Sequence, residues 1–475
     1  MDTAVAVEKA TSLDEPLLEV SGRPNSYSDG DDKPSAAEFD FVYEKVNWYL
    51  VPTLFLINLV CYVDRCNVSM VKSKLGDAID LSETEYGIGT GIFFLPYALL
   101  QIPSNEVLKK VGTPLWLGII LIGWGISSSA TGLVQTTGQF YAARLFLGVF
   151  EAGTFPGVLY FLSLFFPESR SAFPVGLTVA GSICGTCLAA PLAAALLELE
   201  GVLGIAGWRW LLLLEGVPAV ALGLFTMSYL PKGPKNATFL SDAEKDIVAK
   251  GFRSDAEPKA PPLSFKEQAW SIVKHGYLWV LLLASVLLTF PQTLGVFWGP
   301  ALIQSMLDGD GNFQFKDEHK DASTVSEVAL LTTIPYLLGG VAMVAIGWSS
   351  THFRERRYHS GTPAILGGVA FGLVPLMARG GIVSGIGFLS LACMGISGFS
   401  GPLTSLAMSY MNESNRAFGV AWWNMMVNLC NFPAAIFLGM LAEETNSYRF
   451  PIYFCASLSV LCGLLFISLK DSSAK

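Results

Sequence analysis

Stretches of about 20 predominantly apolar residues recur along almost the whole chain. A helix of that length spans a bilayer, because each residue adds about 1.5 Å across a hydrocarbon core roughly 30 Å thick. In hydrocarbon a segment must satisfy its own backbone hydrogen bonds, so helices are the expected solution. Only 15% of the residues are charged, against roughly 25% in soluble domains. The sequence therefore predicts an all-α polytopic membrane protein.

About twelve spans are predicted, in two groups of six separated by a polar segment. Such a division favours two pseudo-symmetric six-helix bundles, an arrangement typical of secondary transporters. The first group covers 48–69, 86–107, 114–133, 139–166, 173–197 and 208–230. The second group covers 275–304, 325–349, 361–379, 384–409, 417–441 and 448–469.

The domain boundaries follow changes in composition. The first residues are polar, acidic and rich in Ser and Pro, which predicts a disordered cytosolic tail. Within this tail, Asp14–Leu18 resembles an acidic dileucine sorting signal, and whether it acts as one stays open. The polar segment between the bundles carries several prolines and an amphipathic stretch. The predicted units are a tail at 1–46, a first bundle at 47–230, a cytosolic linker at 231–272, a second bundle at 273–470 and a tail at 471–475.

Loop charges predict the orientation of the chain in the membrane. Basic residues concentrate in the loops that share a side with the amino terminus and the linker, and they are sparse in the opposite loops. Cytosolic loops carry the excess of Lys and Arg in membrane proteins. Both termini are therefore expected in the cytosol. The expected location is the plasma membrane rather than a vacuolar or lysosomal membrane, and the expected state is a monomer.

Several functional classes find no support in the sequence. Basic residues form no sustained stripe, so no nucleic-acid partner is expected. The cysteines lie in or beside apolar runs, and the four histidines fall in or near predicted loops, so neither a metal site nor a cofactor is predicted. No His-Asp, Ser-Lys or metal-ligand cluster indicates an enzyme.

Four ionisable residues lie inside predicted spans of the first half, where an unpaired charge costs several kcal/mol. They are Asp64 and Arg65 in one span, and Arg144 and Glu151 in another. If these two helices adjoin, two acids and two bases can form an alternating network with no net charge. Each carboxylate would then be either ionised and paired or protonated and free, which would couple proton uptake to a change of shape. The alternative is that the pairs only hold the helices in register.

The spans of the second half carry neutral polar groups instead. Amides and hydroxyls often join membrane helices to one another, so contact with a substrate is only one of two interpretations. Asn424 and Asn428 lie four residues apart and share a helix face. We expect a substrate between the halves to be anionic, with its negative group toward the arginines. The candidates on this side are Gln292, Thr404, Asn424 and Asn428.

At these residues the chain resembles the anion:cation symporter family of the major facilitator superfamily, across about 47 to 470. That family includes lysosomal sialic-acid, vesicular glutamate and bacterial sugar-acid carriers, and fungal allantoate, nicotinate and pantothenate permeases; the small-carboxylate permeases are the most similar branch. The motifs that carry the resemblance are Tyr62-x-Asp-Arg-x-Asn67, Tyr97-Ala-Leu-Leu-Gln-Ile-Pro103, the run from Arg144 to Pro156, Gly207-Trp-Arg-Trp210, Glu215-Gly-Val-Pro218, Glu355-Arg-Arg-Tyr-His359 and Asn424-x3-Asn428.

The resemblance implies a proton-driven symporter of small organic anions that works by alternating access. Asp64 and Glu151 match the family's protonation sites, and Arg65 and Arg144 match the arginines that hold acidic partners and the substrate carboxylate. Tyr97 and Asn424 match cavity residues. Ser182 stands where some sugar-acid carriers use a longer amide, which argues against copying their substrate.

Departures from the superfamily pattern concern the gates. The loop between the second and third spans lacks the usual Asp-Arg signature, and so does the equivalent loop in the second half, so the pairing at the inner gate stays open. Two other functions are compatible with the same fold. One is a passive facilitator or exchanger of organic anions, and the other is a nutrient receptor that scarcely transports. The residues expected at the inner gate are Lys109, Lys110, Glu355, Arg356 and Arg357.

Overall fold

The computed structural model describes residues 35–254, 265–274, 276–308, 313, 322–353, 355–409, 411 and 416–468. The amino-terminal stretch that holds Asp14–Leu18 lies outside the described residues, as do 469–475. No strand occurs within the described ranges, and eleven helices there are long and apolar enough to cross a membrane, or twelve if one bent pair counts as a span. The predicted all-α membrane architecture is confirmed.

The first half contains ten helices, nine of which form its six spans, while the short α3 connects the first two spans. The first helix begins well before the predicted 48 because Ser35 caps it: its hydroxyl accepts from the Glu38 amide at 3.2 Å, and the Glu38 carboxylate accepts from the Ser35 amide at 2.7 Å. The helices are α2 (Ala36–Met70), α3 (Lys72–Ile79), α4 (Glu83–Ile92), α5 (Phe94–Leu99), α6 (Gln101–Val111), α7 (Thr113–Thr131), α8 (Thr137–Glu151), α9 (Thr154–Phe165), α10 (Ala172–Leu197) and α11 (Gly207–Tyr229).

Two of these spans are interrupted. The second span bends by 51° between α5 and α6, where Pro96 and Pro103 flank the break. The fourth span is divided between α8 and α9 at Gly153, where an added Cβ would collide with the hydroxyl of Ser104. The interruption after Glu151 therefore brings the helix backbone close to α6.

The second half forms its six spans from seven helices, and two shorter helices occupy the linker. The linker helix α12 packs against α2, where Lys45 Nζ donates to Glu244 Oε1 at 2.8 Å. This hydrogen bond from Lys45 lowers the pKa of Glu244. The helices are α12 (Asp242–Ser254), α13 (Phe265–Val273), α14 (Gly276–Leu307), α15 (Ala322–His352), α16 (Arg357–Ala378), α17 (Ile382–Gly398), α18 (Ser400–Ser409), α19 (Arg416–Thr445) and α20 (Arg449–Ser468).

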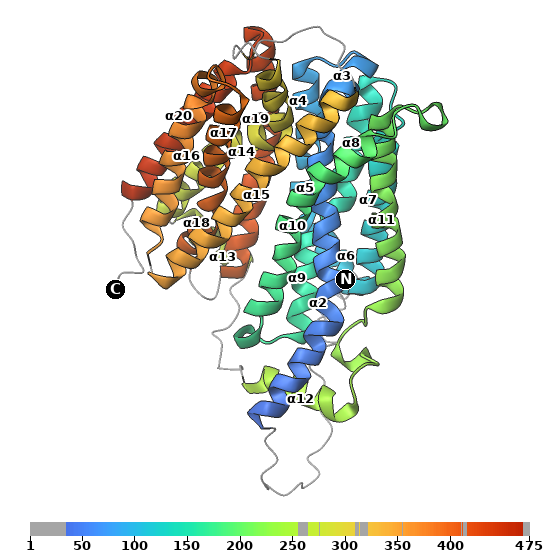
Figure 1. The fold of residues 1–475 in the computed structure, drawn as a ribbon. Helices are drawn as coiled ribbons and strands as arrows, with labels where there is room; N and C mark the ends of the chain where they lie inside the picture. The colour runs from blue at the N-terminus through green and yellow to red at the C-terminus, as the bar shows by residue number, and fades with distance from the viewer. Residues whose placement is uncertain are drawn as a thin grey trace, which may run out of the picture.

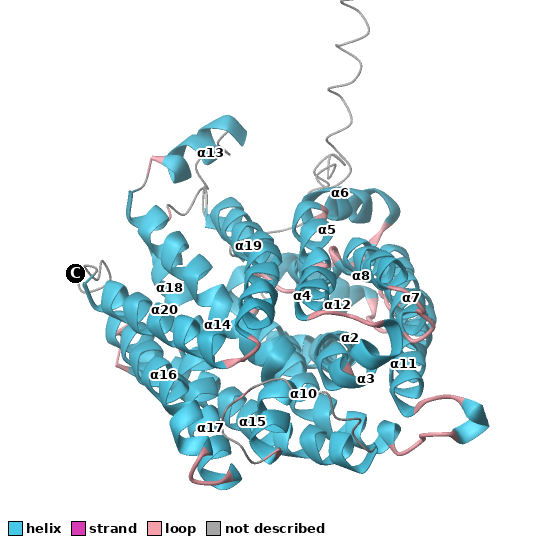
Figure 2. Cartoon of the chain, turned by 90° about the horizontal axis from the view of Figure 1, so that it is seen from above, coloured by secondary structure: helices cyan, strands magenta, loops and turns pink. Residues whose placement is uncertain are grey.

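The two halves form two bundles that lie side by side (Figure 1). They meet along two seams, one between α4 and α19 and one between α10 and α15 (Figure 2). The linker helix α12 lies at one end of the molecule, which we call the linker end, and α3 lies at the other, which we call the far end (Figure 1). A central space enclosed by both bundles is therefore bounded by these seams.

The outward-facing side chains of the spans are apolar. Leu224, Val341 and Leu464 each expose more than half of their surface. Exposed leucine and valine repeated around a protein would promote aggregation in water, whereas lipid chains solvate them. The chain is therefore a multi-pass integral membrane protein whose polar groups turn inward.

Within the first bundle, small residues allow α10 to lie directly against α2. A Cβ added to Gly181 would collide with the carbonyl oxygen of Phe55, and one added to Gly185 would collide with that of Leu59. Four residues separate the two glycines, so they share one face of α10. This close packing holds α2, which carries Asp64 and Arg65, in a fixed position.

This packing yields a stability prediction. Gly185→Ala should lower the free energy of unfolding by about 1–3 kcal/mol, because the methyl group has no space against Leu59. Gly176→Ala is the matched control on the same helix, since a Cβ there meets nothing within 4 Å. The thermal midpoint of purified protein in detergent should fall for the first variant and stay or rise for the second. Equal midpoints would contradict the packing described.

Candidate functional site

An ion pair joins α2 to α8 at the centre of the first bundle. Arg65 Nε donates to Glu151 Oε1 at 2.5 Å, and a terminal nitrogen of the same guanidinium forms an ion pair with that oxygen. The thiol of Cys61 donates to Oε1 at 2.9 Å. Glu151 is fully buried, and its second oxygen has no hydrogen-bond partner within the described chain. Glu151 is the last residue of α8, so the helix break that follows places it there.

Aromatic rings surround the arginine of this pair. The Arg65 guanidinium carbon lies 4.8 Å from the ring centre of Tyr97, 5.1 Å from that of Tyr62 and 5.6 Å from that of Phe93. Ring faces carry partial negative charge and so stabilise a cation that is shielded from water. The rings therefore lower the cost of keeping Arg65 charged when it is not paired.

Asp64 points away from this pair. Consecutive residues of a helix are turned by about 100°, and Asp64 faces α7, where Trp124 Nε1 donates to one carboxylate oxygen at 3.0 Å and the Ser128 hydroxyl donates to the other. The expected alternating network of two acids and two bases is therefore not the arrangement found. Arg65 and Glu151 pair as expected, but donors from α7 take the place of an arginine at Asp64.

Arg144 has no carboxylate paired with it in the described part of the chain. Its side chain is only 3% exposed, and its Nε has no hydrogen-bond partner. Its guanidinium carbon lies 5.1 Å from the ring centre of Phe93, the ring that also contacts Arg65. Asp64 and Glu151 are the acidic charges that act on it. Arg144 is thus a buried cation held near two acids without being bonded to either.

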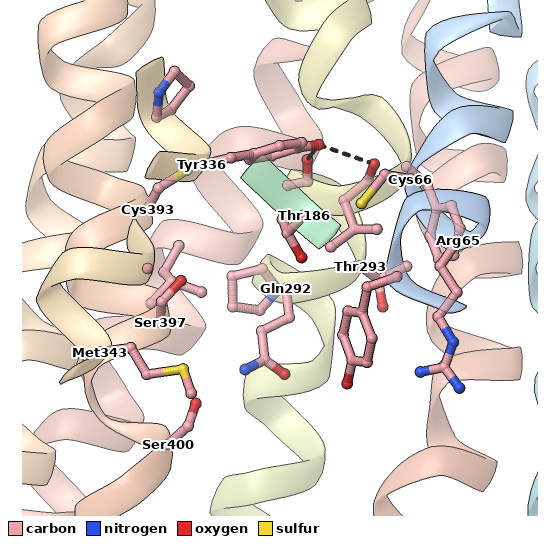
Figure 3. Close-up of a pocket in the computed structure, with 18 of the residues that line it drawn as sticks. Arg65, Cys66, Thr186, Gln292, Thr293, Tyr336, Met343, Cys393, Ser397 and Ser400 are labelled. Atoms are coloured by element: carbon pink, nitrogen blue, oxygen red, sulfur yellow. Dashed lines mark hydrogen bonds between the residues drawn. The ribbon is translucent and has the colours of Figure 1, made fainter. Parts of the chain in front are cut away.

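Both arginines line a cavity of about 410 Å³ between the bundles. Arg65 stands on one side, Met343, Ser397 and Ser400 stand on the other, and Gln292 lies between them (Figure 3). The two arginines are the charged residues of the lining, and the second bundle contributes neutral polar and apolar groups. Among the polar groups of the second bundle that line the cavity are Gln292, Thr293, Tyr336, Ser397, Ser400 and Asn431.

The predicted residues of the second bundle are only partly at this cavity. Gln292 lines it, as does Ser182 from the first bundle. Asn428 Nδ2 donates to Asn424 Oδ1 at 2.8 Å, and neither of these two side chains is among the described residues that line the cavity. Asn431, on the same helix, lines the cavity and accepts a hydrogen bond from the Thr293 hydroxyl at 3.0 Å.

Two further predicted residues stand apart from the lining. Tyr97 lies beneath Arg65, with 5% of its surface exposed, so it supports the arginine rather than forming the cavity wall. Thr404 belongs to α18, and its side chain lies outside what the structure describes.

The predicted gating residues lie at the linker end, and the hydrogen bonds and ion pairs described for Lys109, Glu355 and Arg356 stay within one bundle. Lys109 Nζ donates to Glu106 at 2.8 Å. Arg356 donates to the carbonyl oxygen of Ser405 at 3.1 Å, and Glu355 pairs with His359 at 2.9 Å. Lys110 is in the same helical turn as Lys109, and Arg357 contacts Tyr358. Each of these contacts stays on its own side of the space between the bundles.

The far end is different, because there the bundles are bonded to each other. Glu83, at the start of α4, forms an ion pair with Lys72 and accepts hydrogen bonds from Trp298 Nε1 at 2.7 Å and from the Tyr448 hydroxyl at 2.8 Å. Lys72 Nζ also donates to Tyr448 at 2.9 Å. Because Trp298 and Tyr448 belong to the second bundle, one carboxylate fastens the two bundles together. We call Glu83, Lys72, Trp298 and Tyr448 the clasp.

A second set of contacts continues this closure between α4 and the helices α14 and α19. The Tyr86 hydroxyl donates to the carbonyl oxygen of Phe297 at 2.9 Å, and the Thr84 amide donates to the Glu443 carboxylate at 2.8 Å. A Cβ added to Gly91 would lie 2.9 Å from the carbonyl oxygen of Phe432. The far end of the cavity is therefore closed by close backbone contact as well as by the clasp.

One buried acid was noted in the sequence only as part of a family motif and not as a charge inside a span. Glu215, on α11, is 6% exposed, and neither carboxylate oxygen has a hydrogen-bond partner among the described residues. It lies inside an apolar run, so the criterion that selected Glu151 would also have selected it. The sequence did not indicate the clasp in this way, because Lys72 and Glu83 lie at the ends of spans, where charged residues are common.

Comparisons with known proteins agree with this architecture. Residues 54–411 match the family model described as the Major Facilitator Superfamily. A putative tartrate transporter of Agrobacterium vitis is 31% identical, over 91% of this chain and 95% of its own length. A putative metabolite transport protein, NicT, of Pseudomonas putida is also 31% identical, over 90% and 94%.

A solved structure shows the same fold at lower identity. It is a bacterial homologue of the human lysosomal transporter Spinster, in an inward-facing and unoccupied conformation. The two chains are 16% identical and superpose with a TM-score of 0.73, over 91% of this chain and 97% of the other.

The clasp yields a prediction about the far end. Glu83→Gln should weaken the contacts from Lys72, Trp298 and Tyr448. The loss of one charge-assisted hydrogen bond, about 1.5–3 kcal/mol, shifts the equilibrium between the closed and the open far end roughly ten- to hundredfold. A membrane-impermeant thiol reagent applied from the far end should then modify Cys66, which lines the cavity, at least tenfold faster. The measurement uses a background in which Cys66 is the only cysteine.

Glu85→Gln is the matched control for this experiment. Glu85 lies in the same first turn of α4, but it accepts from the Ser82 amide at 3.0 Å and takes no part in the clasp. Labelling of Cys66 should stay at the original rate in this variant. Equal acceleration in both variants would mean that helix capping, and not the clasp, holds the far end shut.

Proposed function

The chain belongs to the Major Facilitator Superfamily of membrane transporters, and we propose that it carries a small organic anion together with protons across the membrane by alternating access. The observation that carries this proposal is Arg144, a buried guanidinium that lines the cavity and pairs with no carboxylate of the described residues. A carboxylate on the substrate would supply the missing partner.

The cavity suits a small anionic substrate. Its volume of about 410 Å³ falls within the range of small-molecule sites, roughly 300–1,000 Å³. Arginine binds carboxylates through two parallel hydrogen bonds, which fixes both position and orientation. The neutral polar wall opposite, with Gln292 and Asn431, would hydrogen-bond the uncharged part of the molecule. The name of the Agrobacterium vitis relative makes tartrate the first anion to test.

The pair of Arg65 and Glu151 offers a direct link between proton and anion. While Glu151 is ionised, Arg65 is neutralised and has little attraction for a substrate. A proton that binds Glu151 breaks this ion pair and leaves Arg65 charged against its aromatic rings. The site then gains one positive charge, and a carboxylate restores neutrality. Proton and anion therefore enter together because each offsets the charge of the other. Asp64, whose donors come from α7, is the second proposed proton site.

Alternating access would use the difference between the two ends. In the conformation described, the clasp fastens the bundles at the far end, while Lys109 and Arg356 at the linker end bond within their own bundles. We infer that the linker end faces the cytosol and that the cavity loads or unloads there, in a plasma membrane. Opening the clasp and closing the linker end would expose the same arginines to the opposite side.

Glu151→Gln tests the coupling. The amide cannot release a proton, so Arg65 stays unpaired whatever the pH. In proteoliposomes, accumulation of radiolabelled tartrate driven by a pH gradient of one unit should fall by up to about tenfold, since one coupled proton contributes about 1.36 kcal/mol per pH unit. Exchange of internal for external tartrate without a gradient should persist. If tartrate is not carried, the best-accumulated acid of a panel of small carboxylates takes its place.

The control and the contradicting result concern the same assay. Glu106→Gln removes an exposed carboxylate that pairs with Lys109 one turn away, and accumulation should not change. A passive facilitator would show no gradient-driven accumulation in the unmodified protein and no difference in Glu151→Gln. A receptor would bind the acid but show neither uptake nor exchange.

Arg144→Lys tests the anion site separately. Lysine keeps the charge but loses the planar pair of donors, so tartrate should bind about ten- to hundredfold more weakly, as expected for the loss of a charge-assisted hydrogen bond of about 1.5–3 kcal/mol. Arg170→Lys is the control, since Arg170 pairs with the exposed Asp40 away from the cavity. Binding measured by scintillation proximity on purified protein gives the comparison. Unchanged affinity in Arg144→Lys would remove Arg144 from the site.

A further inference from the structure

The cavity wall that the second bundle contributes is largely apolar. Leu389, Ala392 and Ile396 line the cavity from α17, and their spacing of three and four residues places them on one face of that helix. Met343 of α15 and Phe371 of α16 line it as well. Apolar surface in a binding site favours an apolar ligand surface, because both leave water on binding. The body of the substrate, beyond its carboxylate, is therefore expected to be mainly apolar.

Aromatic rings form another part of the lining, where the two bundles meet. Phe94 of α5 and Phe297 of α14 both line the cavity, with their ring centres 6.0 Å apart and their planes at 80°. Phe93 also lines the cavity, and its ring contacts the guanidinium groups of both cavity arginines. A planar acid can therefore pack against these rings while its carboxylate reaches an arginine.

Several hydroxyl groups of the lining already donate their hydrogen within the protein. Thr293 donates to Asn431 at 3.0 Å, and Tyr336 donates to the carbonyl oxygen of Gly295 at 3.2 Å. A hydroxyl has one hydrogen, so these groups can accept from a ligand but cannot donate to it. The lining hydroxyls engaged in this way include those of Ser182, Thr186, Thr293 and Tyr336.

Two neutral polar side chains of the second-bundle wall remain to meet a ligand. The amide of Gln292 and the hydroxyl of Ser397 have no hydrogen bond to another described residue, and Gln292 lies between Arg65 and Ser397 (Figure 3). These groups suit one or two neutral polar atoms, such as a ring nitrogen or a single hydroxyl. A second carboxylate on this side would meet no positive charge among the described lining residues, and burying it would be costly.

The charges of the first bundle limit the valence of the substrate. Asp64, Glu151, Arg65 and Arg144 sum to zero when all four are ionised, so one proton on Glu151 leaves a single positive charge. One carboxylate then restores neutrality. A dicarboxylate would leave a negative charge in a dry site unless Asp64, whose oxygens already accept hydrogen bonds from α7, also took a proton. One proton therefore matches one monovalent anion.

We propose that the cavity takes a compact, mainly apolar monocarboxylate of the aromatic-acid class, with one or two neutral polar atoms, and that tartrate is a poor ligand. The carboxylate binds at Arg144, the ring packs between Phe93 and the apolar face of α17, and a polar atom of the ring meets Gln292. This inference rests on the proposed function, because it takes the cavity as the transport site, and it narrows the class of acid carried there.

Binding to the purified full-length protein tests this class directly. Radiolabelled benzoate, nicotinate and tartrate are compared by scintillation proximity at one pH. Benzoate and nicotinate should each bind at least about tenfold more tightly than tartrate, since an apolar pocket disfavours added hydroxyl and charged groups. Nicotinate has a ring nitrogen that can accept from Gln292. Tartrate that binds as tightly as benzoate would overturn the inference.

Two substitutions change the wall without a large change of side-chain size. Met343→Gln makes the apolar wall polar, so the preference for benzoate over tartrate should fall about tenfold. Gln292→Met should weaken nicotinate about tenfold and leave benzoate unchanged. Met377→Gln is the control, because Met377 is a partly buried methionine that is not among the described lining residues. Preferences that stay as in the unmodified protein in both cavity variants would contradict the assignment of these walls.

A transport arm separates this inference from the proposed symport. Nicotinate and tartrate are offered to proteoliposomes with a pH gradient, and uptake by protein-free liposomes is subtracted. Nicotinate that binds as expected but is not accumulated would refute the symport and leave the ligand class standing. Accumulation of tartrate without accumulation of nicotinate would refute the ligand class and leave the symport standing.

Discussion

The ion pair between Arg65 and Glu151 is the contact around which the rest of the site is arranged. It places two opposite charges in the dry interior, where either one alone would cost several kcal/mol. Arg65 belongs to the helix that α10 holds by glycine packing, and Glu151 ends a helix that breaks immediately afterwards. The pair depends on both features, and among the described residues it leaves Arg144 as the cavity cation without a bonded acid. The described cavity wall of the second bundle carries neutral groups instead of an equivalent charge.

The spans were largely predictable from the sequence, because lipid demands long apolar helices whatever the fold. The helix at Ala172–Leu197 was predicted at 173–197, and the one at Gly207–Tyr229 at 208–230. The start of α2 was not predictable from the sequence, since its first turns are amphipathic and pack on the linker helix rather than in lipid. Nor was the bend between α5 and α6, because proline is tolerated in membrane helices with and without a kink.

The site was predictable where a charge marked it and much less so where it did not. Arg65 and Glu151 stood out because charges are rare inside spans. Asn424 and Asn431 look alike in the sequence and, two turns apart, lie on nearly the same face of α19, so only their position along the helix decides that Asn431 reaches the cavity. The partners of Asp64 come from α7, and no local pattern announces that Trp124 and Ser128 face it. Such pairings depend on how helices far apart in the chain are placed around one another.

The balance of charges in the first bundle has an electrical consequence. The charges of Asp64, Glu151, Arg65 and Arg144 sum to zero, and the described residues of the second bundle that line the cavity add no charge. An empty carrier of this kind turns over without moving net charge through the field, so a membrane voltage, worth about 2.3 kcal/mol per charge per 100 mV, does no work on the return step. A univalent anion loaded with a single proton is neutral as well. Voltage would then act only when cargo valence and proton number differ, and the concentration gradients alone would set the direction of flow in every other case.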